Sequence, residues 1–193
     1  MKGRESGMPE EEYWNTFFDA DCLTGRLFAA LPDDGAVVEF GSGYGTFFLS
    51  AARRTSGAVF GFEIEPELVA LVNGRCAAAG LTNAKVVRRD FMTEGTGLQV
   101  RSVDHAMVYN ILHIEDPVRL LAEALRVLKP GAAVSIIHWR SDIPTPRGPS
   151  LHIRPSVTQC IAWAEAAGFS DPEIFDVADC CPYHYAVVMK RPG

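Results

Sequence analysis

The sequence predicts an open, doubly wound α/β sheet built from one chain of 193 residues. Short apolar segments of strand length alternate with segments that have helical periodicity, which indicates parallel βαβ units. No composition break or internal repeat divides the chain, and its length is that of one ordinary domain. In sheets of this kind, ligands bind outside the carboxyl ends of the strands. We therefore expect a functional site at that edge.

The first elements follow from spacing and from turn residues. Residues 9–31 carry aromatic and apolar side chains three and four positions apart, which predicts one or two amphipathic helices. The turn at 33–35 leads into AVVEF, a buried strand that ends at glycines. The expected strands cover residues 36–40, 58–64, 84–90, 102–110, 132–139, 173–177 and 183–190.

Helices between these strands are predicted from their start and stop signals. One follows the glycines at 46–54, and the next starts at Pro66 and stops at Gly80. Another opens with Asp116-Pro117 and stops at Lys129-Pro130-Gly131. Ser156 and Gln159 have the spacing of a capping box, so a helix is expected from there to Gly168. We divide the single domain into a helical cap (1–31), a core that is expected to bind the ligand (36–139), and a segment with a loop, a helix and the terminal strands (140–193).

Composition narrows the classes of partner and compartment. No apolar run reaches the roughly 18–20 residues that a membrane span needs, and the charged N-terminus is unlike a secretory signal. We expect no membrane span and a cytoplasmic location. A net charge of -6 opposes binding to a phosphate backbone, so nucleic acid is not an expected partner. The five cysteines show no C-x-x-C pairing and are expected to be reduced thiols.

The motif EFGSGYG, residues 39–45, is the first feature that indicates chemistry. Glycines allow a tight turn and a close approach of the backbone to a ligand, and a helix N-terminus after them offers free N–H groups. Two acids follow at the next strand ends. Glu63 is placed to accept ribose hydroxyls, and Asp90 with Phe91 suits an adenine amine and ring face. Together these positions predict a nucleotide-like cofactor.

These motifs resemble those of the class I S-adenosylmethionine-dependent methyltransferases, in the small-molecule group called type 11 or ubiquinone-biosynthesis-like. The resemblance runs from about Val37 to Val134, roughly half of the chain. It is carried by VVEFGSGYGTF, GFEIEPE, RRDF, SVDHAMVYNILHIED and LAEALRVLKPGA. It implies a Rossmann-like sheet with an antiparallel last strand, S-adenosylmethionine as cofactor and S-adenosylhomocysteine as product.

The resemblance also implies roles for individual residues. Glu39 would hold the methionine amino group, Glu63 the ribose, Asp90 and Phe91 the adenine, and Asn110 would lie beside the sulfonium. The full set of expected cofactor residues is Glu39, Gly41, Ser42, Gly43, Gly45, Glu63, Ile64, Asp90, Phe91 and Asn110.

Two other functions agree with parts of the pattern. An NAD(P)-dependent oxidoreductase also uses a glycine turn and an acid after the second strand, but its G-x-G-x-x-G pattern needs glycine where Thr46 stands. A non-catalytic S-adenosylmethionine-binding protein, acting through a partner, would keep the same cofactor residues.

The acceptor is expected to be a small molecule, and the sequence does not define its identity or the oligomeric state. Methyl transfer from a sulfonium is an in-line displacement that depends mainly on positioning. If a general base is used, the candidates are His113 and His138. The expected acceptor-binding residues are Tyr13, Trp14, Trp139, Arg140, Arg147 and Arg154. Cys180, Cys181 and His184 lack a further spaced ligand, so no metal is expected.

Overall fold

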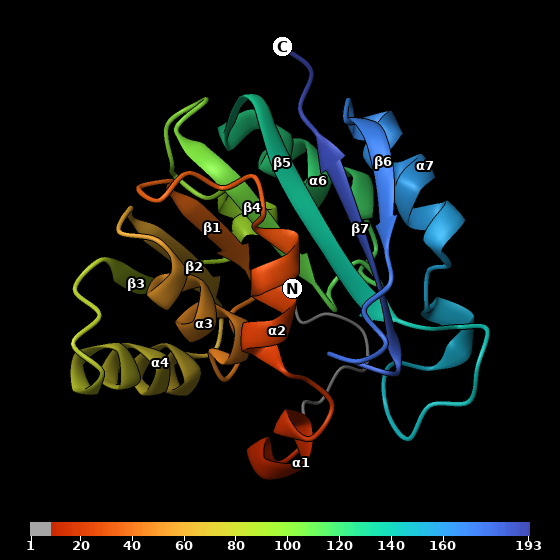
Figure 1. Cartoon of the computed structure of the whole chain (residues 1–193), viewed down its shortest axis with the longest axis horizontal. Coiled ribbons are helices and arrows are strands. Elements are labelled where there is room, and N and C mark those ends of the chain that lie inside the picture. The colour runs from red at the N-terminus through yellow and green to blue at the C-terminus, as the bar shows by residue number, and fades with distance from the viewer. Residues whose placement is uncertain (1–8) are drawn as a thin grey trace.

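A computed structural model describes residues 9–193, and it confirms the predicted fold class (Figure 1). Seven strands form one sheet in the order β3-β2-β1-β4-β5-β7-β6. The strands are β1 Val37–Phe40, β2 Val59–Glu63, β3 Ala84–Arg88, β4 Val103–Tyr109, β5 Leu128–Trp139, β6 Ser170–Phe175 and β7 His184–Lys190. The helices are α1 Glu11–Asn15, α2 Ala20–Leu27, α3 Thr46–Arg54, α4 Pro66–Ala78, α5 Phe91–Glu94, α6 Pro117–Val127, the 3-10 turn η1 Leu151–Ile153, and α7 Val157–Ala167.

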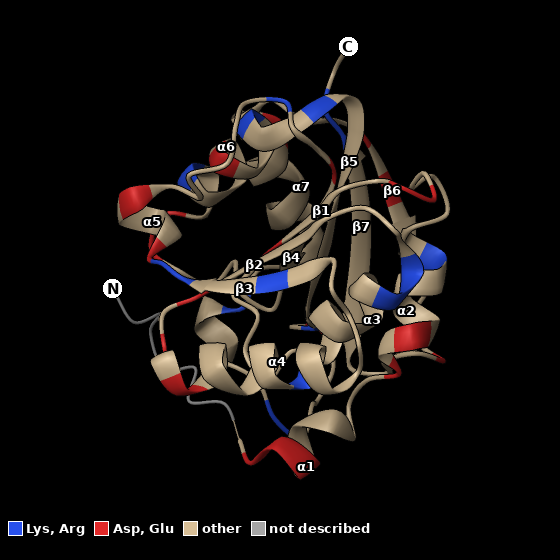
Figure 2. Ribbon diagram, turned by 90° about the vertical axis from the view of Figure 1, so that its left-hand side faces the viewer, with Lys and Arg blue, Asp and Glu red and all other residues tan. Residues whose placement is uncertain are grey.

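Helices cover both faces of the sheet, as Figure 2 shows with the sheet between its two layers. On one face, α6 and α7 pack against β1, β4 and β5 in an apolar core that includes Leu120, Leu121 and Ala164. On the other face, α2, α3 and α4 pack in a second core that includes Leu23 and Phe48. Burial on both faces explains why β1 has the sequence VVEF, in which Glu39 is the one residue that is not apolar.

The order of the strands reverses beside β1. After β1 the chain adds β2 and β3 on one side and then crosses to place β4 on the other side. All these pairings are parallel, so the carboxyl ends of β1, β2 and β4 lie at the same edge. A reversal of this kind opens a crevice between the loops that leave the two neighbouring strands. The motif at 39–45 leaves β1 at this point.

The helix signals in the sequence correspond to observed caps. Asp116 accepts a hydrogen bond from the Arg119 amide at 3.0 Å, with Pro117 in the first turn. Ser156 and Gln159 exchange both bonds of the predicted capping box. Gly168 ends that helix in the left-handed region, at φ 106°. These local interactions explain why the helix ends were readable from the sequence.

Several predicted boundaries are wrong. β5 begins at Leu128 instead of 132, because Leu128 pairs with Val103 before an irregularity in the register that Gly131 accommodates at φ 77°. β6 covers Ser170–Phe175 instead of 173–177, and it is an exposed edge strand whose pairing partner β7 sets its position. β3 ends at Arg88, and Asp90 instead caps the short helix α5. The predicted antiparallel last strand is confirmed, since β7 runs antiparallel to β5.

The predicted N-terminal cap has two short helices, α1 and α2, and residues 1–8 of that segment lie outside the described residues. Hydrogen bonds and an ion pair attach the start of the cap to the core. The Trp14 indole donates to the Thr46 hydroxyl at 3.1 Å, and the Tyr44 hydroxyl donates to the Pro9 carbonyl at 3.0 Å. Arg75 on α4 forms a two-pronged ion pair with Glu11. The cap therefore lies over the edge where the glycine motif emerges.

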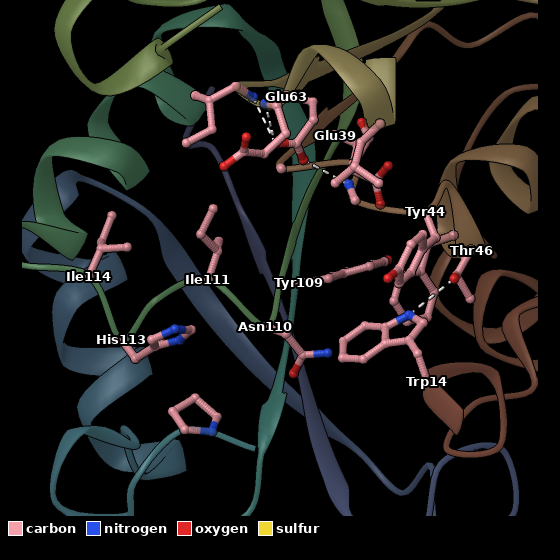
Figure 3. Close-up of a pocket in the computed structure, with 18 of the residues that line it drawn as sticks. Trp14, Glu39, Tyr44, Thr46, Glu63, Tyr109, Asn110, Ile111, His113 and Ile114 are labelled. Carbon is pink, nitrogen blue, oxygen red and sulfur yellow. Dashed lines mark hydrogen bonds between the residues drawn. The ribbon is translucent and has the colours of Figure 1, made fainter. Parts of the chain in front are cut away.

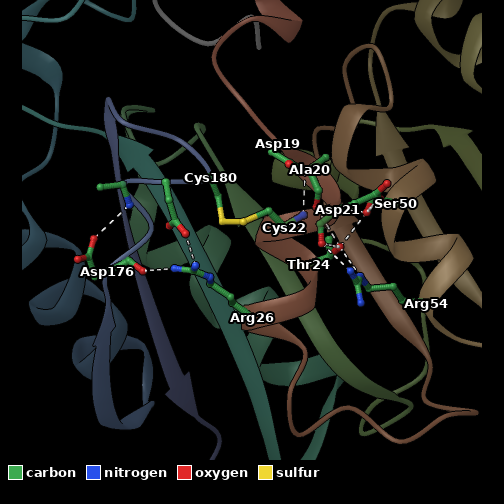
Figure 4. Close-up of a disulfide and its surroundings, with 12 residues drawn as sticks. Asp19, Ala20, Asp21, Cys22, Thr24, Arg26, Ser50, Arg54, Asp176 and Cys180 are labelled. Carbon is green, nitrogen blue, oxygen red and sulfur yellow. Dashed lines mark hydrogen bonds and ion pairs between the residues drawn. A yellow bond between two sulfur atoms is a disulfide. The ribbon is translucent and has the colours of Figure 1, made fainter.

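The prediction that all five cysteines are reduced is wrong for two of them. Cys22 on α2 and Cys180 in the loop before β7 form a disulfide, with their Cα atoms 5.6 Å apart (Figure 4). The two residues are separated by 158 positions, so only the tertiary fold brings them together. Cys76, Cys160 and Cys181 are free and buried. Within residues 9–193, no helix is both long and apolar enough to cross a membrane.

Candidate active site

A cavity of about 540 Å³ opens at the carboxyl edge of the sheet, between the ends of β1, β2 and β4. Its size lies within the range of about 300–1,000 Å³ that is usual for small-molecule sites. Figure 3 shows Glu39 and Glu63 at one end of this view and Trp14 and His113 at the other, on either side of Asn110. The cavity therefore connects the predicted cofactor residues to predicted acceptor-side residues.

The glycine motif adopts the backbone that the sequence predicts. Gly41, Gly43 and Gly45 all have positive φ, at 79°, 50° and 81°. A side chain at Gly41 would have its Cβ 2.9 Å from the Cδ1 atom of Ile111. These positions therefore require glycine, and they bring the backbone close to the cavity.

Glu63 holds the glycine motif in place from the end of β2. One carboxylate oxygen, Oε2, accepts the Gly43 amide at 2.9 Å. The other, Oε1, accepts the amides of Ile64 at 2.8 Å and Glu65 at 3.2 Å. Each carboxylate oxygen can accept two hydrogen bonds, so Oε2 still has capacity toward the cavity.

Glu39 is buried at the end of β1, with 1% of its surface exposed, and it lines the cavity. Among the described residues its Oε2 atom has no hydrogen-bond partner. Burial raises the pKa of Glu39 well above its ordinary value, and the nearby Glu63 carboxylate adds to the rise. A buried carboxylate without a partner is costly, so this group favours a cationic ligand that would keep it ionised.

Asn110 lies at the end of β4 with φ 55°, in the left-handed region that asparagine tolerates better than most residues. Its backbone amide donates to the Ile137 carbonyl at 2.7 Å. Both polar atoms of its side chain are buried without a partner among residues 9–193. Strained backbone and unused polar groups occur together at functional sites, so Asn110 is a candidate to contact a ligand.

Tyr109 lines the cavity beside Asn110, although no motif in the sequence predicted it as a site residue. Its hydroxyl hydrogen-bonds to Ser135 Oγ at 2.7 Å, and Ser135 in turn bonds His105 Nε2 at 2.7 Å. Burial raises the pKa of Tyr109, so its hydroxyl stays protonated. The only sequence signal is its position immediately before Asn110, since residues at strand ends face this edge.

The structure brings most of the predicted residues together at the cavity. Of the predicted cofactor residues, all except Gly45 line it. Of the predicted acceptor-side and catalytic residues, it is lined by Trp14, Trp139, Arg147 and His113. His138 lies behind His113 and is fully buried. Lining residues that the sequence analysis missed are Pro9, Tyr44, Thr46, Phe47, Glu65, Leu68, Met92, Tyr109, Ile111, Ile114, Gly148 and Pro149.

Three predicted acceptor-binding residues do not line the cavity. Tyr13 is 44% exposed and stacks edge-on against Phe17. Arg140 pairs with Asp142 through two hydrogen bonds, at 3.0 and 2.7 Å. Arg154 has another role, which its sequence position does not reveal. It donates to four oxygens of the preceding segment, the carbonyls of Arg140, Arg147 and Pro149 and the hydroxyl of Thr145, and so holds that loop in shape.

Cys180, one of the three soft side chains considered in the sequence, is bonded to Cys22 and is not available to bind a metal. Within the described part of the chain, Cys22, Asp179 and Cys180 are the one group of three potential ligands that lie close together. Two of those three are the disulfide sulfurs, which are not available as thiolates.

The fold and the site together define a class I S-adenosylmethionine-dependent methyltransferase: a seven-stranded sheet with a reversed last strand, a glycine turn after β1 and an acid at the end of β2. Residues 37–131 match the family model described as a methyltransferase domain, and the chain belongs to this class of enzymes. The assignment removes the NAD(P)-dependent oxidoreductase as an alternative.

Solved structures share the fold over most of the chain. A SAM-dependent methyltransferase from Aquifex aeolicus superposes with a TM-score of 0.79 at 21% identity, covering 91% of this chain and 90% of that one. The geranyl diphosphate C-methyltransferase from Streptomyces coelicolor A3(2) gives a TM-score of 0.74 at 15% identity, covering 89% and 78%. The phosphoethanolamine N-methyltransferase 2 from Haemonchus contortus gives 0.73 at 15% identity, covering 93% and 53%.

Proposed function

We propose that this methyltransferase acts on a small molecule, which binds in the same cavity as S-adenosylmethionine and is methylated by in-line displacement. The observation that carries the proposal is that one continuous cavity of about 540 Å³ connects Glu39 and Glu63 to His113 and Arg147. A cavity of this size suits a donor and a small acceptor, and a protein or nucleic-acid acceptor would have to insert a group into it. The Streptomyces and Haemonchus enzymes are named for small acceptors, which agrees with this reading.

The residues at the cofactor end suit the groups of S-adenosylmethionine. Glu39, buried with an unpartnered oxygen, would pair with the ammonium of the methionine part. Glu63 would accept a ribose hydroxyl through the remaining capacity of Oε2, and Asp90 and Phe91 would contact the adenine. Asn110, with both side-chain polar atoms unused, would lie beside the reacting centre.

The cofactor supplies an electrophilic methyl group on a positively charged sulfur, which keeps the electron pair of the S–CH₃ bond when the methyl group leaves. The protein's contribution is to orient the acceptor and to exclude water. Trp14 from the cap and Trp139 from β5 supply apolar walls, and Trp139 is 2% exposed. The hydrogen bond from Trp14 to Thr46 fixes the first of these walls to the start of α3.

The test is a radiolabelled methyl-transfer assay with a panel of quinols, hydroxy acids, amines and thiols, with formation of S-adenosylhomocysteine as the second readout. We expect transfer to one class of small acceptor, with product and S-adenosylhomocysteine in equal amounts. Transfer only to protein or nucleic-acid acceptors would contradict the proposal. The cytoplasmic location stays a prediction, and fractionation of the source cells tests it.

Arg147 offers a more specific prediction about the acceptor. It lies at the exposed rim of the cavity, in the loop shaped by Arg154. We propose that it binds an anionic or hydrogen-bonding group on the acceptor. Arg147→Met is expected to raise the KM for the acceptor about tenfold, because a charge-assisted bond contributes roughly 1.5 kcal/mol or more.

The matched control is Arg140→Met, because Arg140 lies in the same segment but is paired with Asp142 outside the cavity. The affinity for S-adenosylhomocysteine should not change in either variant. Equal effects of the two substitutions on KM would show that Arg147 does not contact the acceptor.

A further inference from the structure

Two histidines form a hydrogen-bonded pair on the acceptor side of the cavity. His113 lies in the loop after β4 and lines the cavity on the side away from Trp14 (Figure 3). His138 lies behind it, near the end of β5, and is fully buried. His113 Nδ1 and His138 Nε2 are 3.2 Å apart. The pair therefore reaches from the cavity wall into the interior.

The partners of the pair determine which nitrogen atoms carry hydrogen. His138 Nδ1 lies 3.3 Å from the Trp139 carbonyl, which can only accept a hydrogen bond. The hydrogen of neutral His138 is therefore on Nδ1, and its Nε2 is an acceptor. His113 must then donate from Nδ1, which leaves its Nε2 without hydrogen and with a lone pair.

Burial keeps both rings in this neutral form at neutral pH. It lowers the pKa of His113 to about 4. The pKa of His138 is lowered to about 3, first by burial and then by the nearby His113 and Arg154. His113 lines the cavity and His138 is fully buried behind it, so a proton that enters or leaves the pair does so at His113.

His113 Nε2 is buried and has no hydrogen-bond partner among residues 9–193. An acceptor removed from water without a partner destabilises the fold, and most buried polar groups avoid that state. A donor hydrogen on a ligand bound in the cavity would give this atom a partner.

We propose that His113 Nε2 is the general base for methyl transfer, that His138 is a positioning residue that sets the tautomer of His113, and that the acceptor carries an O–H or N–H group at the methylated atom. The inference rests on the proposed function. In this step the acceptor's O–H or N–H bond breaks, and the acceptor atom bonds to the methyl carbon. The proton passes to His113 Nε2 and leaves to solvent after the product departs. His138 Nε2 keeps accepting from Nδ1 as the imidazolium forms, as the third group of a catalytic triad does.

The first test does not need an acceptor or turnover. Long-range ¹⁵N–¹H NMR spectra of the protein labelled in histidine report which ring nitrogen carries hydrogen. We expect His113 and His138 both to show hydrogen on Nδ1. A spectrum with hydrogen on Nε2 of His113 would overturn the inference, whatever the outcome of the methyl-transfer panel.

The second test uses His138→Leu and His138→Gln with an acceptor from the panel. His138→Leu removes the acceptor for His113 Nδ1, and kcat should fall on the order of 100-fold while KM stays within about threefold. His138→Gln places an amide oxygen near the same position and should recover most of kcat. Calorimetry with S-adenosylhomocysteine should give the same affinity in all three proteins, which confirms that they fold.

An unchanged kcat in His138→Leu would overturn the positioning role. Equal loss in the Leu and Gln variants would do the same, because it would indicate packing instead of hydrogen bonding. If no small acceptor is methylated but the NMR spectra show the expected tautomers, the proposed function is wrong. The hydrogen bonding between His113 and His138 is then still correct.

Discussion

Glu63→Ala is expected to reduce the affinity for S-adenosylhomocysteine about 10- to 100-fold. The charge-assisted bond between the free acceptor position of Oε2 and the ribose diol would be lost, and such a bond contributes roughly 1.5–3 kcal/mol. The same substitution removes the acceptor of the Gly43 amide, 2.9 Å away, so the glycine turn would also lose its anchor. Isothermal titration calorimetry measures the change directly.

Two matched measurements separate these effects. Glu67→Ala removes the same charge from an exposed position on α4 and should leave affinity unchanged. A 2′-deoxyribose analogue tests the diol without altering the protein. If the wild-type protein bound that analogue as tightly as S-adenosylhomocysteine, Glu63 would act only through the glycine turn.

The disulfide is expected to have the largest effect on stability. Replacing both Cys22 and Cys180 by serine should lower the free energy of unfolding by about 2–5 kcal/mol, because the cross-link closes a long loop and restricts the unfolded chain. The bond joins the cap to the loop before β7, where Arg26 also bonds the Asp176 carbonyl at 2.8 Å (Figure 4). Urea denaturation measures the loss.

Reductant provides the control for this prediction. The wild-type protein in excess dithiothreitol should approach the stability of the double serine variant, and the variant itself should not respond. Five alkylatable thiols in the denatured, unreduced wild-type protein would contradict the disulfide. Since cytosolic thiols are usually kept reduced, the same measurement made on freshly lysed cells bears on the predicted cytoplasmic location.

The sheet and the cofactor end of the site were predictable because their signals are local. Each strand–helix unit carries its own caps, such as Ser156 with Gln159, and parallel strands send their carboxyl ends to the same edge. Glu63 could therefore be placed at this edge from the sequence pattern, whereas the roles of Glu39 and Asn110 came from the resemblance to the family. The edge strand β6 was misplaced because its few apolar residues give no clear alternation, and its neighbour sets the pairing.

The acceptor side was less predictable because its contacts are tertiary. Arg147 and Arg154 have the same residue type and lie in the same segment, yet one lines the cavity and the other binds loop carbonyls. The pairing of His113 with His138 depends on the neighbouring positions of β4 and β5 in the sheet. Cys22 and Cys180 meet across 158 positions. Spacing in the sequence holds no signal for these contacts.

Calorimetric titration of the wild-type protein with S-adenosylhomocysteine and with NADH tests the central claim most directly. The cavity at the ends of β1, β2 and β4 predicts one molecule of S-adenosylhomocysteine bound per chain and no measurable heat with NADH. Binding of NADH without binding of S-adenosylhomocysteine would contradict the assignment of this cavity to the methyl donor. The buried carboxylate of Glu39 would then have no cationic partner.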